Sequence, residues 1–142
     1  MKKRAAAVIV KDGSVLLMQR YTSKQGKFFV FPGGLVEAGE TEEQAMIREV
    51  REELSIVVLK FKFLFEWYNP YAEPPYEPKQ EYYYLATDFS GQVELGGEEK
   101  EFMTENNQYA PVWVKLAEIE KLENLYPETA KQKVLSSLQG IS

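Results

Sequence analysis

Apolar runs separated by turn-forming residues dominate the first third of the chain and predict short β-strands joined by tight turns. Residues 5–10 are small and β-branched, residues 11–14 supply a turn, and residues 15–20 are the expected returning strand. A polar stretch at residues 22–27 predicts a loop, after which residues 28–31 form a brief apolar segment. This part of the chain therefore predicts a hairpin followed by a loop and a brief apolar segment.

The pattern then changes to that of a helix. Residues 32–34 read Pro-Gly-Gly, and two adjacent glycines after a proline are expected to prevent regular structure there and to let backbone groups approach a ligand closely. Apolar residues at helical spacing follow at Ile47, Val50 and Leu54. Thr41, with Gln44 three residues later, fits a capping box. We therefore expect a helix over residues 41–54 with one face on the core.

The second half of the chain mixes strands, loops and helices. Apolar and polar residues alternate over residues 57–67, which predicts a half-buried strand with one face formed by Val57, Leu59, Phe61, Phe63, Phe65 and Trp67. Loops are expected at residues 69–79 and 91–108, strands at 81–87 and 111–114, and helices at 116–122 and 127–138. Strands interleaved with helices predict a single α/β domain over residues 1–142, with helices on both faces of a sheet.

The amino-acid composition excludes several kinds of catalytic and metal-binding site. The chain has no cysteine and no histidine, which excludes a thiol nucleophile, a thiolate metal site and the usual general base. Any metal must then be held by oxygen, a donor that favours Mg²⁺ or Mn²⁺. The net charge of −5 argues against a nucleic-acid-coating protein. The apolar run at residues 5–10 is too short for a signal segment or a membrane span, so we expect a cytoplasmic protein.

Three carboxylates carry the candidate chemistry. On a helix, Glu49, Glu52 and Glu53 stand at positions i, i+3 and i+4 and share one face. Like charges at this spacing destabilise a solvated helix by about 0.2–0.5 kcal/mol per pair, whereas a divalent cation among them makes the arrangement favourable. Taken alone, such a run is more often a solvated acidic face, and Pro-Gly-Gly alone is more often a plain turn.

The joint spacing resembles the Nudix box of the Nudix hydrolases, whose consensus is glycine, five residues, glutamate, seven residues and Arg-Glu-apolar-x-Glu-Glu-x-Gly-apolar. Residues 34–56 match it at Gly34, Glu40, Arg48, Glu49, Val50, Glu52, Glu53 and Ile56. Residues 29–34 also match the aromatic-x-aromatic-Pro-Gly-Gly lead-in common in the family. Ser55 stands where glycine is usual, which costs on the order of 1 kcal/mol if the helix ends in a left-handed conformation, but this is not a ligand position. The resemblance implies an α/β/α sandwich with a mixed central sheet.

The resemblance also implies roles for individual residues. Glu52 and Glu53 bind metal, Glu49 binds metal or activates the attacking water, and the carbonyl of Gly33 completes a site for Mg²⁺ or Mn²⁺. Arg48 orients a glutamate of the box, with an ordinary surface ion pair as the alternative. Glu40, just before the helix, is expected to brace the junction between loop and helix.

Further candidates lie outside the box. Some Nudix enzymes place the general base on a loop, where Glu99 is the candidate, with Glu98, Glu101 and Glu81 as further acidic side chains. Arg20 is a candidate contact for a substrate phosphate, and an exposed strand-end cation is the alternative. Tyr71 and Tyr76, in the 69–79 loop, are candidates for stacking on a base. For Tyr82 and Tyr84, core packing is the better interpretation.

The function implied is metal-dependent hydrolysis of a pyrophosphate bond in a nucleoside diphosphate linked to another group. Nucleoside triphosphates, oxidised nucleotides, dinucleoside polyphosphates and nucleotide sugars are all candidate substrates. A catalytically silent Nudix-like domain that senses a nucleotide or a protein is the alternative, and an acidic globular domain with a coincidental box is a third. The expected partner is a small nucleotide-like molecule, not nucleic acid or a membrane, and a homodimer is left open because many relatives are dimers.

Overall fold

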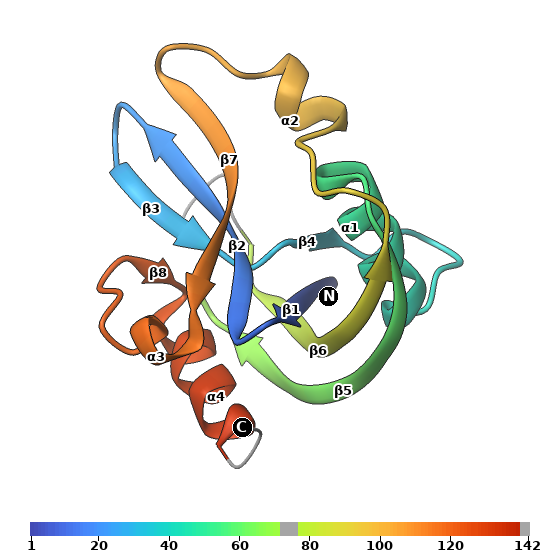
Figure 1. The fold of residues 1–142 in the computed structure, drawn as a ribbon. Helices are drawn as coiled ribbons and strands as arrows, with labels where there is room; N and C mark the ends of the chain where they lie inside the picture. The colour runs from blue at the N-terminus through green and yellow to red at the C-terminus, as the bar shows by residue number, and fades with distance from the viewer. Residues whose placement is uncertain (72–76, 140–142) are drawn as a thin grey trace.

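The computed structural model describes residues 1–71 and 77–139, which form a mixed sheet with helices on both of its faces (Figure 1). The strands are β1 (Lys2–Lys11), β2 (Ser14–Thr22), β3 (Gly26–Val30), β4 (Gly33–Leu35), β5 (Val57–Asn69), β6 (Lys79–Ser90), β7 (Asn107–Lys115) and β8 (Leu125–Tyr126). The helices are α1 (Glu42–Leu54), α2 (Gly97–Glu101), α3 (Leu116–Ile119) and α4 (Glu128–Leu138). The strand order is β5-β6-β1-β2-β3-β8, with β4 paired to β1 and β7 paired to β2. The pairs β1–β6 and β3–β8 are parallel and the others antiparallel, so the sheet is mixed, as predicted.

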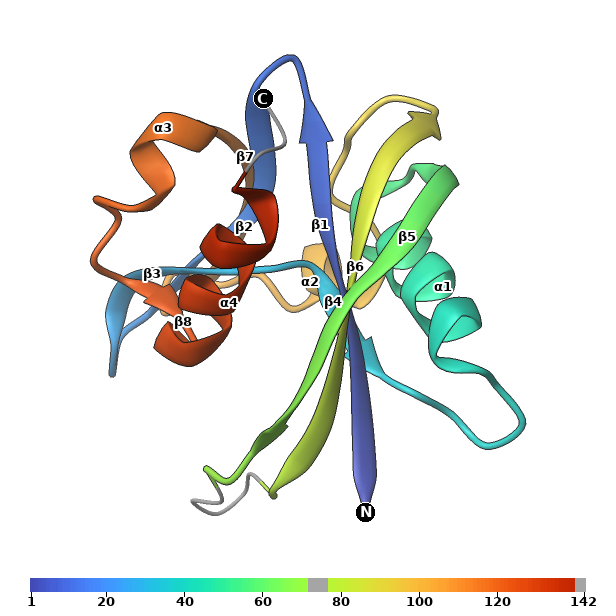
Figure 2. The ribbon, with the colours of Figure 1, turned by 90° about the horizontal axis from the view of Figure 1, so that it is seen from below.

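Two hydrophobic cores lie on opposite faces of this sheet. Successive side chains of a strand point to opposite faces, and β1 divides its apolar residues in this way. Ala6 and Val8 pack with the side chains of α4, whereas Ala5, Ala7 and Ile9 pack with those of α1. Figure 2 shows α1 on one side of the sheet and α3 with α4 on the other. The predicted α/β/α sandwich is therefore confirmed.

Helix α1 begins and ends as its sequence predicts. The Thr41 hydroxyl accepts a hydrogen bond from the Gln44 N–H at 3.1 Å, and the Gln44 side chain accepts one from the Thr41 N–H at 2.9 Å. Val50 and Leu54 are fully buried on the core side. The helix ends at Ser55, whose φ of 63° lies in the left-handed region expected at a position where the family usually has glycine.

The Pro-Gly-Gly turn is more regular than predicted. Gly33 and Gly34 belong to β4 and pair with Ala6 and Ala5 of β1. A side chain at Gly33 would overlap the backbone carbonyl of Ala5. The prediction that the two glycines prevent regular structure is wrong, because the missing side chains let this short strand pair closely with β1.

The alternation predicted for residues 57–67 is also wrong. Leu59 and Phe63, predicted on the apolar face, are 55% and 52% exposed, whereas Val58, which is not part of that predicted face, is buried. The pairing of β5 with β6 shifts register at three places, the last between Phe63 and Phe65. Each irregularity changes which face the following side chains meet, and β5 is an edge strand, where such bulges are common.

Other boundaries differ in ways that bear on the site. The 91–108 segment, predicted as a loop, contains α2 and the start of β7. The helix predicted at residues 116–122 ends at Ile119, and the two-residue strand β8 was not predicted. Part of the 69–79 loop, including Tyr76, lies outside the described residues. Within residues 1–71 and 77–139, no helix combines the length and apolar character needed to cross a membrane.

Candidate active site

Helix α1 presents its glutamates to the glycines of β4. The Glu53 side chain is buried, and its Oε1 accepts a hydrogen bond from the Gly33 N–H at 3.2 Å. The Glu49 carboxylate lies directly against Gly34, where a side chain would have no room. The structure thus brings two of the three predicted helix glutamates against the double-glycine turn.

A fourth carboxylate joins this group from α2. Burial raises the pKa of the Glu53 carboxyl; Arg4 lowers it, and the negative charges of Glu99 and Glu49 raise it. The pKa of Glu99 is itself raised, first by burial and then by like charges that include Glu49 and Glu52. Glu99, the predicted candidate for an extra base, therefore lies within electrostatic range of the helix glutamates.

The other acidic candidates do not share this position. Glu98 and Glu101 are exposed on α2. Glu81 is buried elsewhere, where it accepts hydrogen bonds from the Asn69 amide at 2.9 Å and the Tyr83 hydroxyl at 3.0 Å. Among the four acidic candidates outside the box, Glu99 is thus the one that the fold places at the site.

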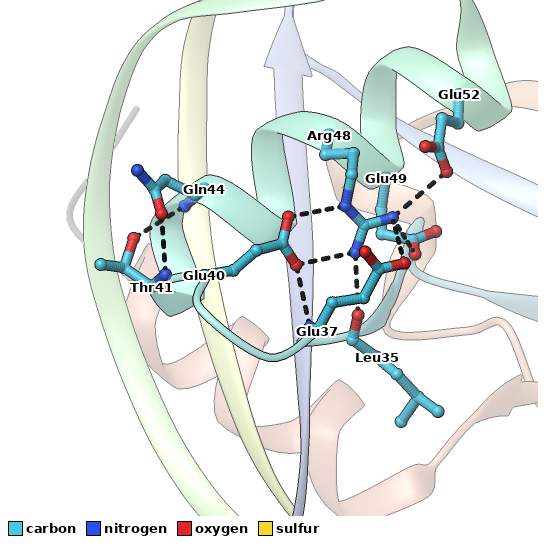
Figure 3. Close-up of polar contacts among 8 residues, drawn as sticks. All are labelled: Leu35, Glu37, Glu40, Thr41, Gln44, Arg48, Glu49 and Glu52. Atoms are coloured by element: carbon cyan, nitrogen blue, oxygen red, sulfur yellow. Dashed lines mark hydrogen bonds and ion pairs between the residues drawn. The ribbon is translucent and has the colours of Figure 1, made fainter.

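Arg48 connects the loop before α1 to the helix glutamates (Figure 3). Its Nε and Nη2 donate to the two carboxylate oxygens of Glu40 at 2.7 and 3.0 Å, and Nη2 also donates to the Leu35 carbonyl at 3.0 Å. Its Nη1 donates to Glu49 at 2.8 Å and to Glu52 at 3.2 Å. These contacts go well beyond a single surface ion pair.

Glu40 closes the loop that Arg48 holds. Its Oε1 accepts a hydrogen bond from the Glu37 N–H at 2.9 Å, as well as the one from Arg48. The hydrogen bond from Arg48, followed by that from Glu37, lowers the pKa of the Glu40 carboxyl to about 2. Glu40 therefore connects residues 37–40 to the helix, which is the bracing geometry expected from its place before α1.

The donor set suits a hard divalent cation in the kind of ligand atom that it offers. All its side-chain donors are carboxylate oxygens, and their mutual repulsion is the kind of electrostatic cost that a cation relieves. The side chains are not arranged as a closed set, however. No group of three or more acidic side chains in the described residues lies close enough to hold one ion. Arg48 donates to one oxygen of Glu49 and one oxygen of Glu52, so the second oxygen of each carboxylate is not bonded to the guanidinium.

Arg20 faces the side of the sheet that carries α1. It lies two residues beyond Met18, which packs in the α1-side core. Its guanidinium lies 3.9 Å from the ring centre of Tyr109 and donates to the Asn107 side chain at 2.6 Å and to the Gln108 carbonyl at 3.3 Å. Arg20 is thus a stacked and hydrogen-bonded cation, not a freely exposed one.

The tyrosine candidates lie elsewhere. Tyr71 is 68% exposed and follows the end of β5, where Asn69 pairs with Lys79 and Lys79 with Lys2. Lys2 is roughly 13 Å along β1 from Ala6, the partner of Gly33, at about 3.3 Å per residue. Tyr71 is therefore not brought to the glycine turn. Tyr84 is buried in the core and Tyr82 is half-buried, in agreement with their packing interpretation.

One residue at the site was missed from the sequence. Arg4 donates from Nη2 to the carbonyl of Phe31 at 2.9 Å, immediately before the Pro-Gly-Gly turn. Its charge interacts with the carboxylates of Glu81 and Glu53. In the sequence it is one of three consecutive basic residues, and no local pattern separates it from Lys2 and Lys3.

Comparisons with known proteins identify the family of this fold. The sequence model of the NUDIX domain matches residues 1–135. An ADP-ribose pyrophosphatase of Methanocaldococcus jannaschii is 32% identical over 97 residues, which cover 66% of this chain and 55% of that protein. An 8-oxo-dGTP diphosphatase of Haemophilus influenzae is 36% identical over 92 residues, which cover 63% of this chain and 65% of that protein. The chain therefore spans between about half and two thirds of the lengths of these relatives.

A solved structure shows the same fold. The solution structure of the E. coli ORF135 protein aligns with a TM-score of 0.74 at 26% identity, over 99% of this chain and 92% of that one. The family match covers nearly the whole sequence, and the structural match includes the sheet and helices that hold the glutamates and the glycine turn. The chain belongs to the Nudix family.

Proposed function

We propose that this chain is an enzyme that hydrolyses a pyrophosphate bond in a nucleoside diphosphate linked to another group. The observation that carries this proposal is the buried Glu53 carboxylate, held by the Gly33 N–H with Glu49 and Glu99 close to it. The two relatives described above are named for ADP-ribose and for 8-oxo-dGTP, and both names denote hydrolysis of a diphosphate linkage. Nudix hydrolases generally use divalent metals. The oxygen donors here favour Mg²⁺, with Mn²⁺ as the second candidate.

The proposed roles combine the family resemblance with the position of each side chain. Glu52 and Glu53 would hold the metal together with the carbonyl of Gly33, and Glu49 either joins them or accepts the proton of the attacking water. Glu99 is the second candidate for that proton, and the effect of Glu49 and Glu52 on its pKa supports this choice. When bound, a divalent metal neutralises charge on the diphosphate and lowers the pKa of a bound water.

Two residues would orient the rest of the site. Arg48 would set the position of the glutamates it contacts and, through Glu40, of the loop before α1. Arg20 would contact a substrate phosphate from the sheet, because its guanidinium faces the α1 side and is held in place by Tyr109. Base stacking by Tyr71 and Tyr76 stays a prediction, and the position of Tyr71 gives it no added support.

A catalytically silent sensor domain is the alternative, and one observation favours it. Arg48 donates to one oxygen each of Glu49 and Glu52, so a guanidinium already neutralises part of the charge at two of the proposed metal ligands. In a domain that only binds a nucleotide, this ion-pair arrangement would persist when ligand is present.

A nucleotide panel with identification of the products tests the proposal. Wild-type protein should release phosphate products only with Mg²⁺ or Mn²⁺, and Glu52→Gln or Glu53→Gln should reduce kcat on the order of 10²- to 10³-fold without loss of the fold. Glu118→Gln, on the exposed surface of α3, is the matched control and should retain wild-type turnover. A panel that yields binding but no turnover with either metal would support the sensor instead.

A further inference from the structure

The C-terminal end of α1 is covered by the segment of residues 91–97. The last carbonyls of a helix lack partners within the helix and need them from elsewhere. Here the Glu94 N–H donates to the Leu54 carbonyl at 3.0 Å, and the Gly96 N–H donates to the Glu53 carbonyl at 3.0 Å. Residues 91–97 are therefore attached through their backbone to the helix turn that carries Glu53.

Residues 96 and 97 lie so close to the end of α1 that each position requires glycine. A side chain at Gly96 would meet the Glu52 carbonyl at 2.9 Å and the Ser55 hydroxyl at 3.1 Å. Gly97, with φ +57°, would bring a side chain to 3.0 Å from the same Glu52 carbonyl. Helix α2 begins at Gly97, so the place of Glu99 depends on how this segment lies against α1.

Ser55 adds a side-chain bond to these backbone contacts. Its hydroxyl donates to the Glu94 carbonyl at 2.9 Å, across 39 residues of sequence. Its backbone is in a left-handed conformation that glycine adopts more easily. A glycine at this position would therefore end the helix with less strain but would lose the bond to residues 91–97.

We propose that Ser55 is a positioning residue, whose hydroxyl fastens residues 91–97 to the end of α1 and so holds Glu99 beside the glutamates of the helix. The inference rests on the proposed function, because the position of Glu99 matters to a reaction only if the site is hydrolytic. It assigns a role to the one position where the chain departs from the box consensus.

Two substitutions separate this role from simple helix termination. Ser55→Gly removes the hydroxyl and the strained backbone, whereas Ser55→Ala removes the hydroxyl and keeps the strain. If the hydroxyl positions Glu99, both variants should lose kcat about tenfold, the rate equivalent of one hydrogen bond, while KM changes by less than about twofold. If Ser55 only ends the helix, Ser55→Gly should match or exceed the wild type in both stability and kcat, which would overturn the proposal.

A double-mutant cycle tests whether Ser55 acts through Glu99. With Glu99→Gln in place, Ser55→Gly should change kcat by less than about twofold, because the side chain that it positions no longer has its function. Losses that multiply in the double variant would overturn the proposal, since Ser55 would then act by another route.

Amide hydrogen exchange tests the attachment without any substrate. The N–H groups of Glu94 and Gly96 should exchange about tenfold faster in both Ser55 variants. The Ala45 N–H, bonded to the Thr41 carbonyl at the other end of α1, is the internal control and should not change. Unchanged exchange at residues 94 and 96 would overturn the proposal. A wild-type protein that turns over no nucleotide would overturn the proposed function instead, and the exchange measurement would still decide whether Ser55 attaches the segment.

Discussion

The Arg48–Glu40 pair shows how single side chains prepare this site. A guanidinium can hold a carboxylate with two parallel hydrogen bonds, and Arg48 does so with Glu40 while Nη1 remains directed at Glu49 and Glu52. The Arg48 side chain thus fixes the positions of the loop and of two glutamates at once. Arg48→Lys would keep the charge but lose this planar geometry, so the two residues are not equivalent here.

The lowered pKa of Glu40 predicts a specific dependence of stability on pH. The carboxyl has a pKa of about 2 in the folded protein and an ordinary value of 4.5, so it stabilises the fold above about pH 4.5 and loses this contribution as the pH falls toward 2. The difference in the free energy of unfolding between wild type and Glu40→Gln should therefore be largest near neutral pH and shrink below pH 4.5. Denaturant unfolding at several pH values measures it, with Glu118→Gln as the control. A difference that is constant down to pH 2 would contradict this assignment.

Packing of α1 against β4 determines where the glutamates meet the glycine turn. The two glycines of β4 leave room for different groups. Gly33 lies against the backbone of β1, and Gly34 lies against the Glu49 carboxylate. Backbone cannot move aside, whereas the end of a glutamate side chain can. The same small residue is thus required for the fold at one position and for the site at the next.

This contrast predicts that a substitution at Gly33 mainly reduces stability, whereas one at Gly34 mainly reduces activity. Gly33→Ala should lower the free energy of unfolding by about 1–3 kcal/mol, because its side chain would overlap the Ala5 carbonyl. Gly34→Ala should leave stability within about 1 kcal/mol but reduce kcat by up to about 10²-fold, because Glu49 must move. Unfolding curves and initial rates on both variants measure the two effects. Equal loss of stability in both, or full activity in Gly34→Ala, would show that the packing of α1 on β4 is not as described.

The whole fold concentrates negative charge where α1, α2 and β4 meet. Separate elements carry Glu53 and Glu99. Burial, followed by the charges of Glu99 and Glu49, raises the pKa of Glu53, and burial, followed by like charges that include Glu49 and Glu52, raises the pKa of Glu99. The protein has a net charge of −5, so distant charges do not offset this repulsion. This repulsion destabilises the folded protein, and the packing of the two hydrophobic cores offsets it. A bound cation should therefore raise the free energy of unfolding.

Metal binding is therefore expected to stabilise the protein even without substrate. At a free Mg²⁺ concentration about 100 times the dissociation constant, the free energy of unfolding should rise by about 2.7 kcal/mol, and a chelator should reverse the rise. Glu53→Gln should abolish this increase while leaving the metal-free protein at least as stable, because it replaces a carboxyl whose charged form is disfavoured by burial. Thermal unfolding with and without Mg²⁺ measures both. An equal increase in Glu53→Gln and wild type would place the cation elsewhere.

Patterns that span a few residues were readable from the sequence. The capping box of Thr41 and Gln44, the buried face of α1 and the left-handed end at Ser55 all involve residues within about one helical turn. The spacing from Gly34 to Ile56 identified the family, and the alternation of strands and helices predicted one sheet with helices on both faces. These properties depend on local geometry, which the order of residues specifies directly.

Contacts between residues far apart in the sequence determined the remaining features of the fold and the site. The bond from Arg4 to Phe31 joins residues 27 apart, the one from Ser55 to Glu94 joins residues 39 apart, and the one from Arg20 to Asn107 joins residues 87 apart. Nothing near any of these residues in sequence indicates its partner. The register shifts of β5, the pairing of β4 with β1 and the position of Glu99 likewise depend on which strands and loops become neighbours when the core closes. Residue spacing could thus name the glutamates of the helix, but contacts between distant segments placed the other groups around them.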